Sequence, residues 1–343
     1  MKNIFDSGKN GLEESLTQWG FPLYYAKQVF LWVCQKKATG FTEMSNLPLA
    51  LRHKLEENLS FGTLKLNDLR QSTDGTEKFL FELTDKNLVE AVIIPAENRV
   101  TACLSSQAGC KFGCKFCASG LLGYKRDLSF AEILGEVIAL KLNSLNREIT
   151  HIVFMGTGEP LDNYDNLMRS VRILNSPEGF NIGARRITIS TCGIIPGMEK
   201  LAKEGLQVEL SISLHAADDK TRSLIMPVNK IYPLNKLIPA CRAYISATNR
   251  QITFEYVLIK GLNSDLQNAK KLAILLNGLK LCKVNLIPAN FIPELGIEPP
   301  NKLEILFFRD FLLKSGVNVT LRTARGKDIE AACGQLRLRY EKK

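Results

Sequence analysis

Hydrophobic and polar positions divide the chain into two stretches with different periods. Apolar side chains first recur at helical spacing in residues 12–37 (LEESLTQWGFPLYYAKQVFLWVCQKK), and they then alternate with polar ones in residues 77–95 (EKFLFELTDKNLVEAVIIP). The first pattern predicts amphipathic helices and the second predicts the strands of a hairpin. We therefore expect residues 1–90 to form a small α+β accessory domain, and we find no catalytic constellation in the first 89 residues.

From about residue 100, short apolar segments rich in β-branched residues alternate with helical ones. Such segments are typical of buried parallel strands. Ser129 and Glu132 form a capping box before an apolar stripe that begins at Phe130, which predicts a long helix. Repeated β-α units predict a parallel sheet or a barrel-like (β/α) fold over residues 91–343, with the active site at the C-terminal ends of the strands. The predicted strands are residues 100–106, 151–155, 186–190, 208–214, 252–258, 283–287 and 317–321.

Composition limits which cell compartment and which class of partner we expect for the protein. The 343 residues are 45% hydrophobic, which is enough for a buried core. No apolar run approaches about 18 residues, and the first residues, MKNIFDSGKNGLEES, hold no signal-peptide core. We expect a soluble, cytoplasmic protein with no membrane partner. The net charge of +10 favours a polyanion such as RNA, but many basic proteins bind no nucleic acid, so charge alone does not establish such a partner.

Three of the nine cysteines stand close together. An odd number in a chain without export signals argues against a disulfide framework. Cys110, Cys114 and Cys117 are spaced C-x3-C-x2-C in a loop directly after a predicted strand. Structural zinc and ordinary iron–sulfur clusters take four protein ligands, so three thiolates suit a four-iron cube with one iron open to a ligand. The same spacing would also allow zinc completed by a distant cysteine, or three unrelated buried thiols.

Polar motifs follow three further predicted strands. They are MGTGEP (155–160), ISTCG (189–193) and SISLHA (211–216). At strand ends these motifs can offer hydrogen bonds to amino, ribose or carboxylate groups. A Gly-Glu-Pro tripeptide alone is usually a plain turn, and a lone histidine is usually structural, as we expect for His53 and His151.

The cysteine loop resembles that of the radical S-adenosylmethionine (radical SAM) enzymes, with Phe116 at their aromatic position. Residues 89–120 (VEAVIIPAENRVTACLSSQAGCKFGCKFCASG) and 325–336 (RGKDIEAACGQL), together with FEYVLIKGLN and VNLIPAN, closely resemble the radical SAM RNA methyltransferases of the RlmN/Cfr family. The resemblance covers essentially the whole chain. It implies a partial (β/α) TIM-like barrel, a [4Fe-4S] cluster on the three cysteines, and SAM bound by Gly158, Glu159, Ser190, Ser213, Leu214, His215 and Asn290.

The resemblance also implies a mechanism that consumes two SAM molecules per turnover. Cys333 takes a methyl group from one SAM, and a radical formed from the second removes a hydrogen from that methyl group. The resulting methylene radical adds to an adenine ring. Glu90 is the expected proton acceptor, and Cys103 forms a disulfide with Cys333 that releases the base.

Several of these residues could instead have no role in catalysis. Cys103 and Cys333 could be buried, inert thiols, and Glu90 could be a solvated strand carboxylate. Phe291 follows Asn290 where the family usually has proline. Four cysteines match no family role: Cys34, Cys192, Cys241 and Cys282.

Basic residues near both cysteine loops could hold an RNA backbone or simply face solvent. They are Lys111, Lys115, Lys125, Arg126, Arg322, Arg325 and Lys327.

The motifs are closer to RlmN, which implies methylation of adenine carbon 2 in 23S rRNA, with tRNA as a candidate second substrate. A Cfr-type enzyme would instead methylate carbon 8. A non-catalytic RNA-binding protein with a structural metal, or a peptide-modifying radical SAM enzyme, would also be compatible with the cysteine spacing. The resemblance implies a low-potential electron donor such as flavodoxin or ferredoxin, and nothing demands more than a monomer.

Overall fold

The computed structural model describes residues 1–36, 38–62, 64–121, 123–145, 148–289, 296–322 and 325–329. Most strands of this described part belong to one large sheet. They are β3 (Lys65–Gln71), β4 (Glu77–Glu82), β5 (Leu88–Ala96), β6 (Arg99–Cys103), β9 (His151–Phe154), β10 (Ile187–Thr191), β11 (Glu209–Ser213), β12 (Ile252–Leu258), β13 (Cys282–Pro288) and β14 (Val319–Leu321). Their order across the sheet is β14-β13-β12-β11-β10-β9-β6-β5-β4-β3.

The type of pairing changes once along this sheet, from antiparallel to parallel at β6. From β6 to β14 all neighbours are parallel, whereas β3, β4, β5 and β6 are joined antiparallel. Each strand predicted from the apolar segments overlaps one strand of the parallel part, and the predicted hairpin is β4 and β5. The expected α/β fold, an open (β/α) barrel, is confirmed.

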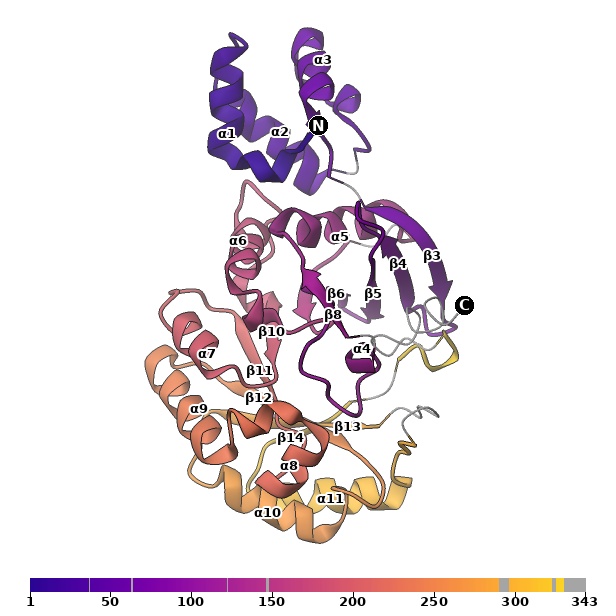
Figure 1. The fold of residues 1–343 in the computed structure, drawn as a ribbon, viewed down its shortest axis with the longest axis vertical. Coiled ribbons are helices and arrows are strands. Elements are labelled where there is room, and N and C mark those ends of the chain that lie inside the picture. The colour runs from indigo at the N-terminus through magenta and orange to yellow at the C-terminus, as the bar shows by residue number, and fades with distance from the viewer. Residues whose placement is uncertain are drawn as a thin grey trace.

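Helices pack against the outer face of the parallel strands and enclose the core (Figure 1). Side chains of that face, such as Ile152, Phe154 and Ile189, are completely buried. The capping box before the first long helix is present, with Glu132 N donating to Ser129 Oγ over 3.2 Å. The helices of this layer are α5 (Phe130–Asn143), α6 (Tyr164–Asn175), α7 (Ile195–Leu201), α8 (Asp219–Ile225), α9 (Leu234–Thr248), α10 (Leu266–Leu276) and α11 (Lys302–Lys314).

The N-terminal helices lie at one end of the molecule (Figure 1), where α1 packs against α5. They are α1 (Ile4–Gln18), α2 (Tyr24–Gln35) and α3 (Leu49–Asn58), and short parallel strands β1 (Lys2–Asn3) and β2 (Leu59–Ser60) pair the two ends of this segment. The division at residue 90 stays a prediction. Residue 90 falls inside β5, and β3–β5 extend the sheet of the barrel.

After β6 the chain leaves the sheet before it enters α5. This excursion contains β7 (Gln107–Gly109), α4 (Ala118–Leu121) and β8 (Tyr124–Asp127), and β7 pairs with β8. The three clustered cysteines lie between β7 and α4. In the part of the chain that the structure describes, no helix is both long and apolar enough to span a membrane.

Candidate active site

The cysteine loop opens into a cavity of about 280 Å³ at the C-terminal ends of the parallel strands. Cys110, Cys114 and Cys117 all line it. The loop starts at Gly109, whose φ is +89° and where a Cβ would lie 1.8 Å from the Gly123 carbonyl oxygen. Only glycine allows β7 and β8 to approach so closely, and this close approach fixes where the loop leaves the hairpin.

Two of the three thiols, Cys110 and Cys114, are disfavoured as thiolates unless a cation is nearby. Burial, together with the neighbouring Cys117, raises the pKa of Cys110 to about 12. Burial likewise raises the pKa of Cys114. Bound iron would supply the positive charge that stabilises the thiolates. Among the described residues, no group of three or more possible ligands is arranged to hold one ion, but each thiolate of a four-iron cube binds a different iron. The residues present therefore fit such a cluster.

Glu159 also lines this cavity. Its carboxylate accepts hydrogen bonds from Cys192 N (2.7 Å) and Leu161 N (3.0 Å). Burial raises the pKa of this carboxyl group, against those hydrogen bonds. Gly158 before it has a φ of +105°, and a Cβ there would lie 2.6 Å from Gln107 Cβ. The turn after β9 therefore packs directly against β7, which carries the cysteine loop.

His215 faces the cysteine loop from the end of β11. Its ring meets Phe116 edge-on, with the centroids 4.6 Å apart, and Nδ1 accepts a hydrogen bond from Val257 N over 3.0 Å. Burial, followed by the charge of Arg222, lowers the pKa of His215 to about 3. A neutral ring with Nδ1 as acceptor carries its proton on Nε2, so His215 offers a donor at neutral pH. Ser190 and Ser213 line the same cavity.

A buried guanidinium holds together the strand ends that border this cavity. Arg222 is 0% exposed and donates to three strand-end carbonyls: Cys192 O (2.8 Å), Leu214 O (3.1 Å) and Ser213 O (3.2 Å). These bonds tie the end of β10 to the end of β11. Leu214 itself is completely buried in the core and does not line the cavity in the described residues.

Cys103 and Glu90 lie on the inner face of the sheet, beside this cavity. Cys103 on β6 is in register with Val92 on β5, which is in register with Lys78 on β4. Glu90 is two residues before Val92 and so points to the same face. Lys78 Nζ lies 3.1 Å from Glu90 Oε2. The sheet therefore brings the two sequence-predicted residues together.

The surroundings of Cys103 shift the pKa of its thiol. Burial raises the pKa of Cys103 to about 11, and the charge of Arg322 lowers it in part. Glu136 from α5 accepts a hydrogen bond from Ser105 N over 3.0 Å, and burial holds its pKa well above the usual range. Ser105 Oγ donates to Glu90 O over 2.7 Å. The Ser105 hydroxyl therefore connects the segment after Cys103 with the backbone of Glu90.

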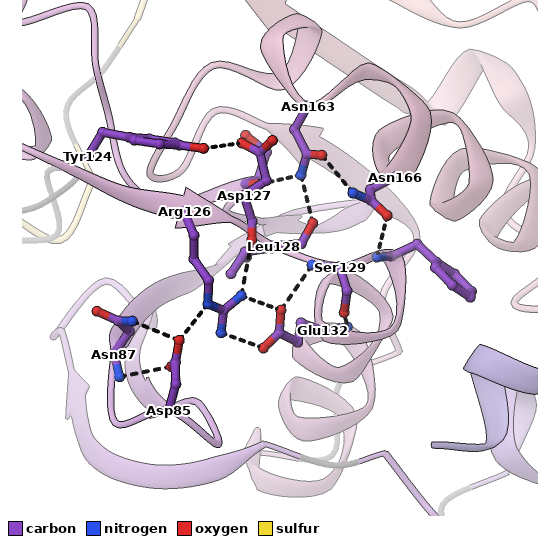
Figure 2. Close-up of polar contacts among 12 residues, drawn as sticks. Asp85, Asn87, Tyr124, Arg126, Asp127, Leu128, Ser129, Glu132, Asn163 and Asn166 are labelled. Atoms are coloured by element: carbon purple, nitrogen blue, oxygen red, sulfur yellow. Dashed lines mark hydrogen bonds and ion pairs between the residues drawn. The ribbon is translucent and has the colours of Figure 1, made fainter. Parts of the chain in front are cut away.

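Two basic residues near the cysteine loop have structural partners. Figure 2 shows Arg126 between Asp85 and Glu132, with Glu132 2.7 Å from Nη1. Lys111 lies 2.7 Å from Asp162. These ion pairs hold β8 and the cysteine loop in place, and contact of Arg126 and Lys111 with RNA stays a prediction. Lys115 and Lys125 are exposed.

Asn163 completes the attachment of the cysteine hairpin. Its side-chain amide donates to Ser106 O (2.8 Å) and Leu128 O (2.7 Å), as Figure 2 shows for Leu128. Both ends of the β7–β8 excursion are thus bound to the residue before α6. Arg322 and Arg325 line a neighbouring cavity. Asn290, Cys333 and the side chain of Lys327 lie outside the described residues.

Sequence reasoning missed four residues of this region. Lys78, Glu136 and Glu255 are charged residues inside buried elements, and Arg222 is a fully buried cation. A detectable signal existed for Glu255, because it interrupts the apolar strand ITFEYVL. Buried charges are rare unless they are paired or functional.

Comparisons with known proteins agree with this geometry. Residues 104–273 match the family model described as "Radical SAM superfamily", and residues 2–60 match "Ribosomal RNA large subunit methyltransferase N-terminal domain". The "Probable dual-specificity RNA methyltransferase RlmN" of Thermoanaerobacter sp. (strain X514) is 45% identical over 100% of this chain and 99% of its own length. The protein of that name from Geobacillus kaustophilus is also 45% identical, over 100% and 94%.

One solved structure covers nearly the same length. The crystal structure of a radical SAM methyltransferase from Sphaerobacter thermophilus superposes with a TM-score of 0.93 at 43% identity. It covers 98% of this chain and 99% of that one.

Proposed function

We propose that this chain, which belongs to the RlmN family of radical SAM RNA methyltransferases, methylates carbon 2 of an adenosine in the peptidyl-transferase region of 23S rRNA. A tRNA adenosine is the proposed second substrate, since the relatives carry a dual-specificity name. The observation that supports this most is the placement of β6. Cys103 ends that strand on the inner face, and the chain passes through β7 into the three-cysteine loop.

The cluster and SAM have proposed holders on the described strand ends. Cys110, Cys114 and Cys117 would hold the [4Fe-4S] cluster. When bound and reduced, the cluster and SAM supply a radical that can remove hydrogen from a methyl group. The buried carboxylate of Glu159 and the donors of Ser190, Ser213 and His215 would orient SAM in the cavity, with Gly158, Leu214 and Asn290 as the further proposed positions.

Cys333, Cys103 and Glu90 would carry out the transfer. The Cys333 thiolate takes a methyl group from a first SAM, and S-adenosylhomocysteine leaves. A second SAM is consumed when one hydrogen atom is removed from this S-methyl group. The methylene carbon that remains then bonds to carbon 2 of the adenine. The adduct would return one electron to the oxidised cluster, which restores the electron that the donor had supplied, and Glu90 would accept the proton of carbon 2.

Cys103 then resolves the adduct. Its thiolate attacks the sulfur of Cys333, a disulfide forms, and the carbon–sulfur bond breaks. The electron pair of that bond stays with the departing carbon, which is protonated to give the methyl group. External thiols reduce the disulfide. Flavodoxin or ferredoxin is the proposed electron donor. We place the enzyme in the cytoplasm as a monomer, with its N-terminal helices on the RNA.

The test uses anaerobically reconstituted protein, unmodified rRNA or tRNA, and methyl-deuterated SAM. Nucleoside mass spectrometry should find 2-methyladenosine whose methyl group lacks one deuterium, because hydrogen is removed from the carried methyl group. An 8-methyladenosine product would show that the enzyme methylates carbon 8, the Cfr-type activity, instead of carbon 2. A fully deuterated methyl group would overturn the route through Cys333. Deoxyadenosine without any methylated adenosine would point to another radical substrate.

A further inference from the structure

The last residues that the structure describes, 325–329, are bound to the turn between β3 and β4. The Asp328 carboxylate accepts hydrogen bonds from Ser72 Oγ and from Thr73 N (3.0 Å). The Asp74 carboxylate accepts another from Gly326 N over 2.9 Å. The partners are 252–256 positions apart in the chain, so these are long-range tertiary contacts. We call the three bonds the turn anchor.

The turn between β3 and β4 is itself ordered by hydrogen bonds where it meets this segment. Asp74 Oδ1 accepts one from Thr76 N over 2.9 Å, and Ser72 N donates to Thr76 O over 2.8 Å. Burial alone would raise the pKa of Asp74, but hydrogen bonds from Thr76 and Gly326 hold it well below its usual range. The hydrogen bond from Ser72 likewise lowers the pKa of Asp328. Both carboxylates are therefore ionised at neutral pH, and hydrogen bonds to an ionised group are stronger than those between neutral groups.

The anchored segment runs from one edge of the large sheet to the other. The two edge strands are β14 and β3. Arg322 directly follows β14, and its N–H donates to Leu286 O of β13 over 2.8 Å. Asp328, six residues later, is bound beside β3, where Figure 1 shows the yellow end of the described chain. The chain is therefore held on both sides of the open barrel.

The register of the strands places the turn anchor close to Cys103. Arg70, Lys78, Val92 and Cys103 form one row across β3, β4, β5 and β6. Thr76 in the turn is two residues before Lys78. Because neighbouring strands are about 4.8 Å apart and residues rise about 3.3 Å along a strand, Thr76 and Cys103 are about 12 Å apart. The turn anchor is therefore a neighbour of the proposed resolving cysteine.

The turn anchor also shortens the tether of Cys333. Cys333 follows Asp328 by 5 residues and Arg322 by 11. An extended chain spans at most about 17 Å over five residues and about 38 Å over eleven. The shorter reach is still longer than the distance from the turn to Cys103. Because the effective concentration of two tethered groups falls roughly as the −3/2 power of tether length, loss of the anchor should lower that of Cys333 at Cys103 about threefold.

We propose that Asp74 and Asp328 are positioning residues, which hold the segment of Cys333 where its sulfur meets Cys103. They act through the backbone that they fasten and not by contact with SAM or the base. The step that they favour is formation of the Cys103–Cys333 disulfide, which releases the methylated base. This inference rests on the proposed function, because it takes these two cysteines as the reacting pair.

The equilibrium between the two thiols and their disulfide tests the turn anchor directly. Cluster-loaded protein without SAM or RNA is equilibrated anaerobically with mixtures of oxidised and reduced dithiothreitol. The two cysteines lose two electrons and two protons to the oxidised reagent, which becomes the dithiol. After alkylation of the free thiols, mass spectrometry of the peptides gives the fraction of Cys103–Cys333 disulfide. Asp328→Ala and Asp74→Ala should each lower the equilibrium constant at least about threefold.

Further measurements separate positioning from a general loss of structure. Asp328→Asn keeps an acceptor oxygen and should recover most of the loss. Glu97→Ala, in the exposed turn between β5 and β6, should leave the equilibrium constant unchanged. Cleavage of SAM to deoxyadenosine with a chemical reductant should match the wild type in every variant. If Asp74→Ala does not fold, Asp328→Ala decides, because it leaves the hydrogen bonds within the β3–β4 turn intact.

The possible outcomes distinguish this proposal from the proposed function. An unchanged equilibrium constant in both anchor variants would overturn the proposal and leave the proposed function unaffected. A wild-type protein that forms no Cys103–Cys333 disulfide would overturn both, because Cys103 could not then resolve the adduct. If SAM cleavage falls in parallel with the disulfide, the two carboxylates support the whole fold and are not positioning residues.

Discussion

The ammonium group of Lys78 lies 3.1 Å from a carboxylate oxygen of Glu90, and the two side chains are 0% and 2% exposed. Water cannot screen either charge at this depth. The pair joins β4 to β5 on the face that also carries Cys103. The residue expected to accept a proton is therefore held beside a fixed positive charge.

Removing one partner of this pair should be costly. Lys78→Met leaves a buried carboxylate beside an apolar side chain, and we expect the free energy of unfolding to fall by about 3–5 kcal/mol. The double variant Lys78→Met/Glu90→Gln should recover most of this loss. Lys86→Met breaks an exposed pair with Glu82 and should cost less than about 1 kcal/mol. Thermal unfolding under anaerobic conditions measures all three, and equal losses for Lys78→Met and Lys86→Met would contradict the prediction.

Glu90→Gln should separate radical formation from product release. Deoxyadenosine should still form, but methylated adenosine should fall at least 100-fold because the amide accepts no proton from carbon 2. A covalent RNA–protein species should then persist on a denaturing gel. The control is Glu136→Gln: burial holds the pKa of this carboxyl group well above its usual range, and an amide of the same shape should lower methylation by less than about tenfold. Normal methylation by Glu90→Gln would remove that residue from the chemistry.

Gly158→Ala should disturb the wall that carries Glu159. A Cβ at this position meets Gln107 at 2.6 Å, on a backbone with a φ of +105°. The substitution should cost more than the roughly 1–2 kcal/mol of left-handed strain alone, and it should weaken SAM binding in equilibrium dialysis. Gly205→Ala has the strain (φ +68°) but nothing within 4 Å of the new atom. If both variants bind SAM equally well, the contact with Gln107 is not important.

His215 should make stability depend on pH. Its pKa falls to about 3 in the folded chain, whereas an unfolded histidine titrates near pH 6.5. Between these values the unfolded state binds the extra proton, so the free energy of unfolding decreases as the pH falls, by up to about 1.4 kcal/mol per pH unit. His215→Gln should remove this part of the slope. Urea unfolding of both proteins between pH 4 and 8 measures it, and parallel curves would show that His215 is not buried as a neutral ring.

The parallel strands were predictable because each is apolar on the face that the helices cover. Ile187 and Ile189, for example, are completely buried. The opposite face was readable in principle, since Thr188 and Ser190, or Lys283 and Asn285, alternate with those apolar residues. We predicted continuously buried strands instead, because short alternations of threonine or serine with isoleucine still have high β propensity.

The site was predictable to the extent that it is local in sequence. The cysteine loop and Gly158–Glu159 each follow a strand, so their convergence follows from parallel topology. Lys78 and Arg222 were not predictable, because their partners come from other strands or are backbone carbonyls. A salt bridge across two strands depends on register, which the sequence alone leaves open. The same holds for Arg126, whose acidic partners Asp85 and Glu132 come from different elements.

The antiparallel pairing of β5 with β6 has a consequence for how such an enzyme can change its chemistry. Glu90, Cys103 and Cys333 all lie outside residues 104–273, the span shared with the wider superfamily. That span holds all three clustered cysteines, whereas the flanking segments hold the residues proposed to decide what becomes of the substrate. Exchange of the β4–β5 hairpin would therefore replace Glu90, the proposed proton acceptor, and its partner Lys78. It would leave the part of the chain that carries the three clustered cysteines unchanged.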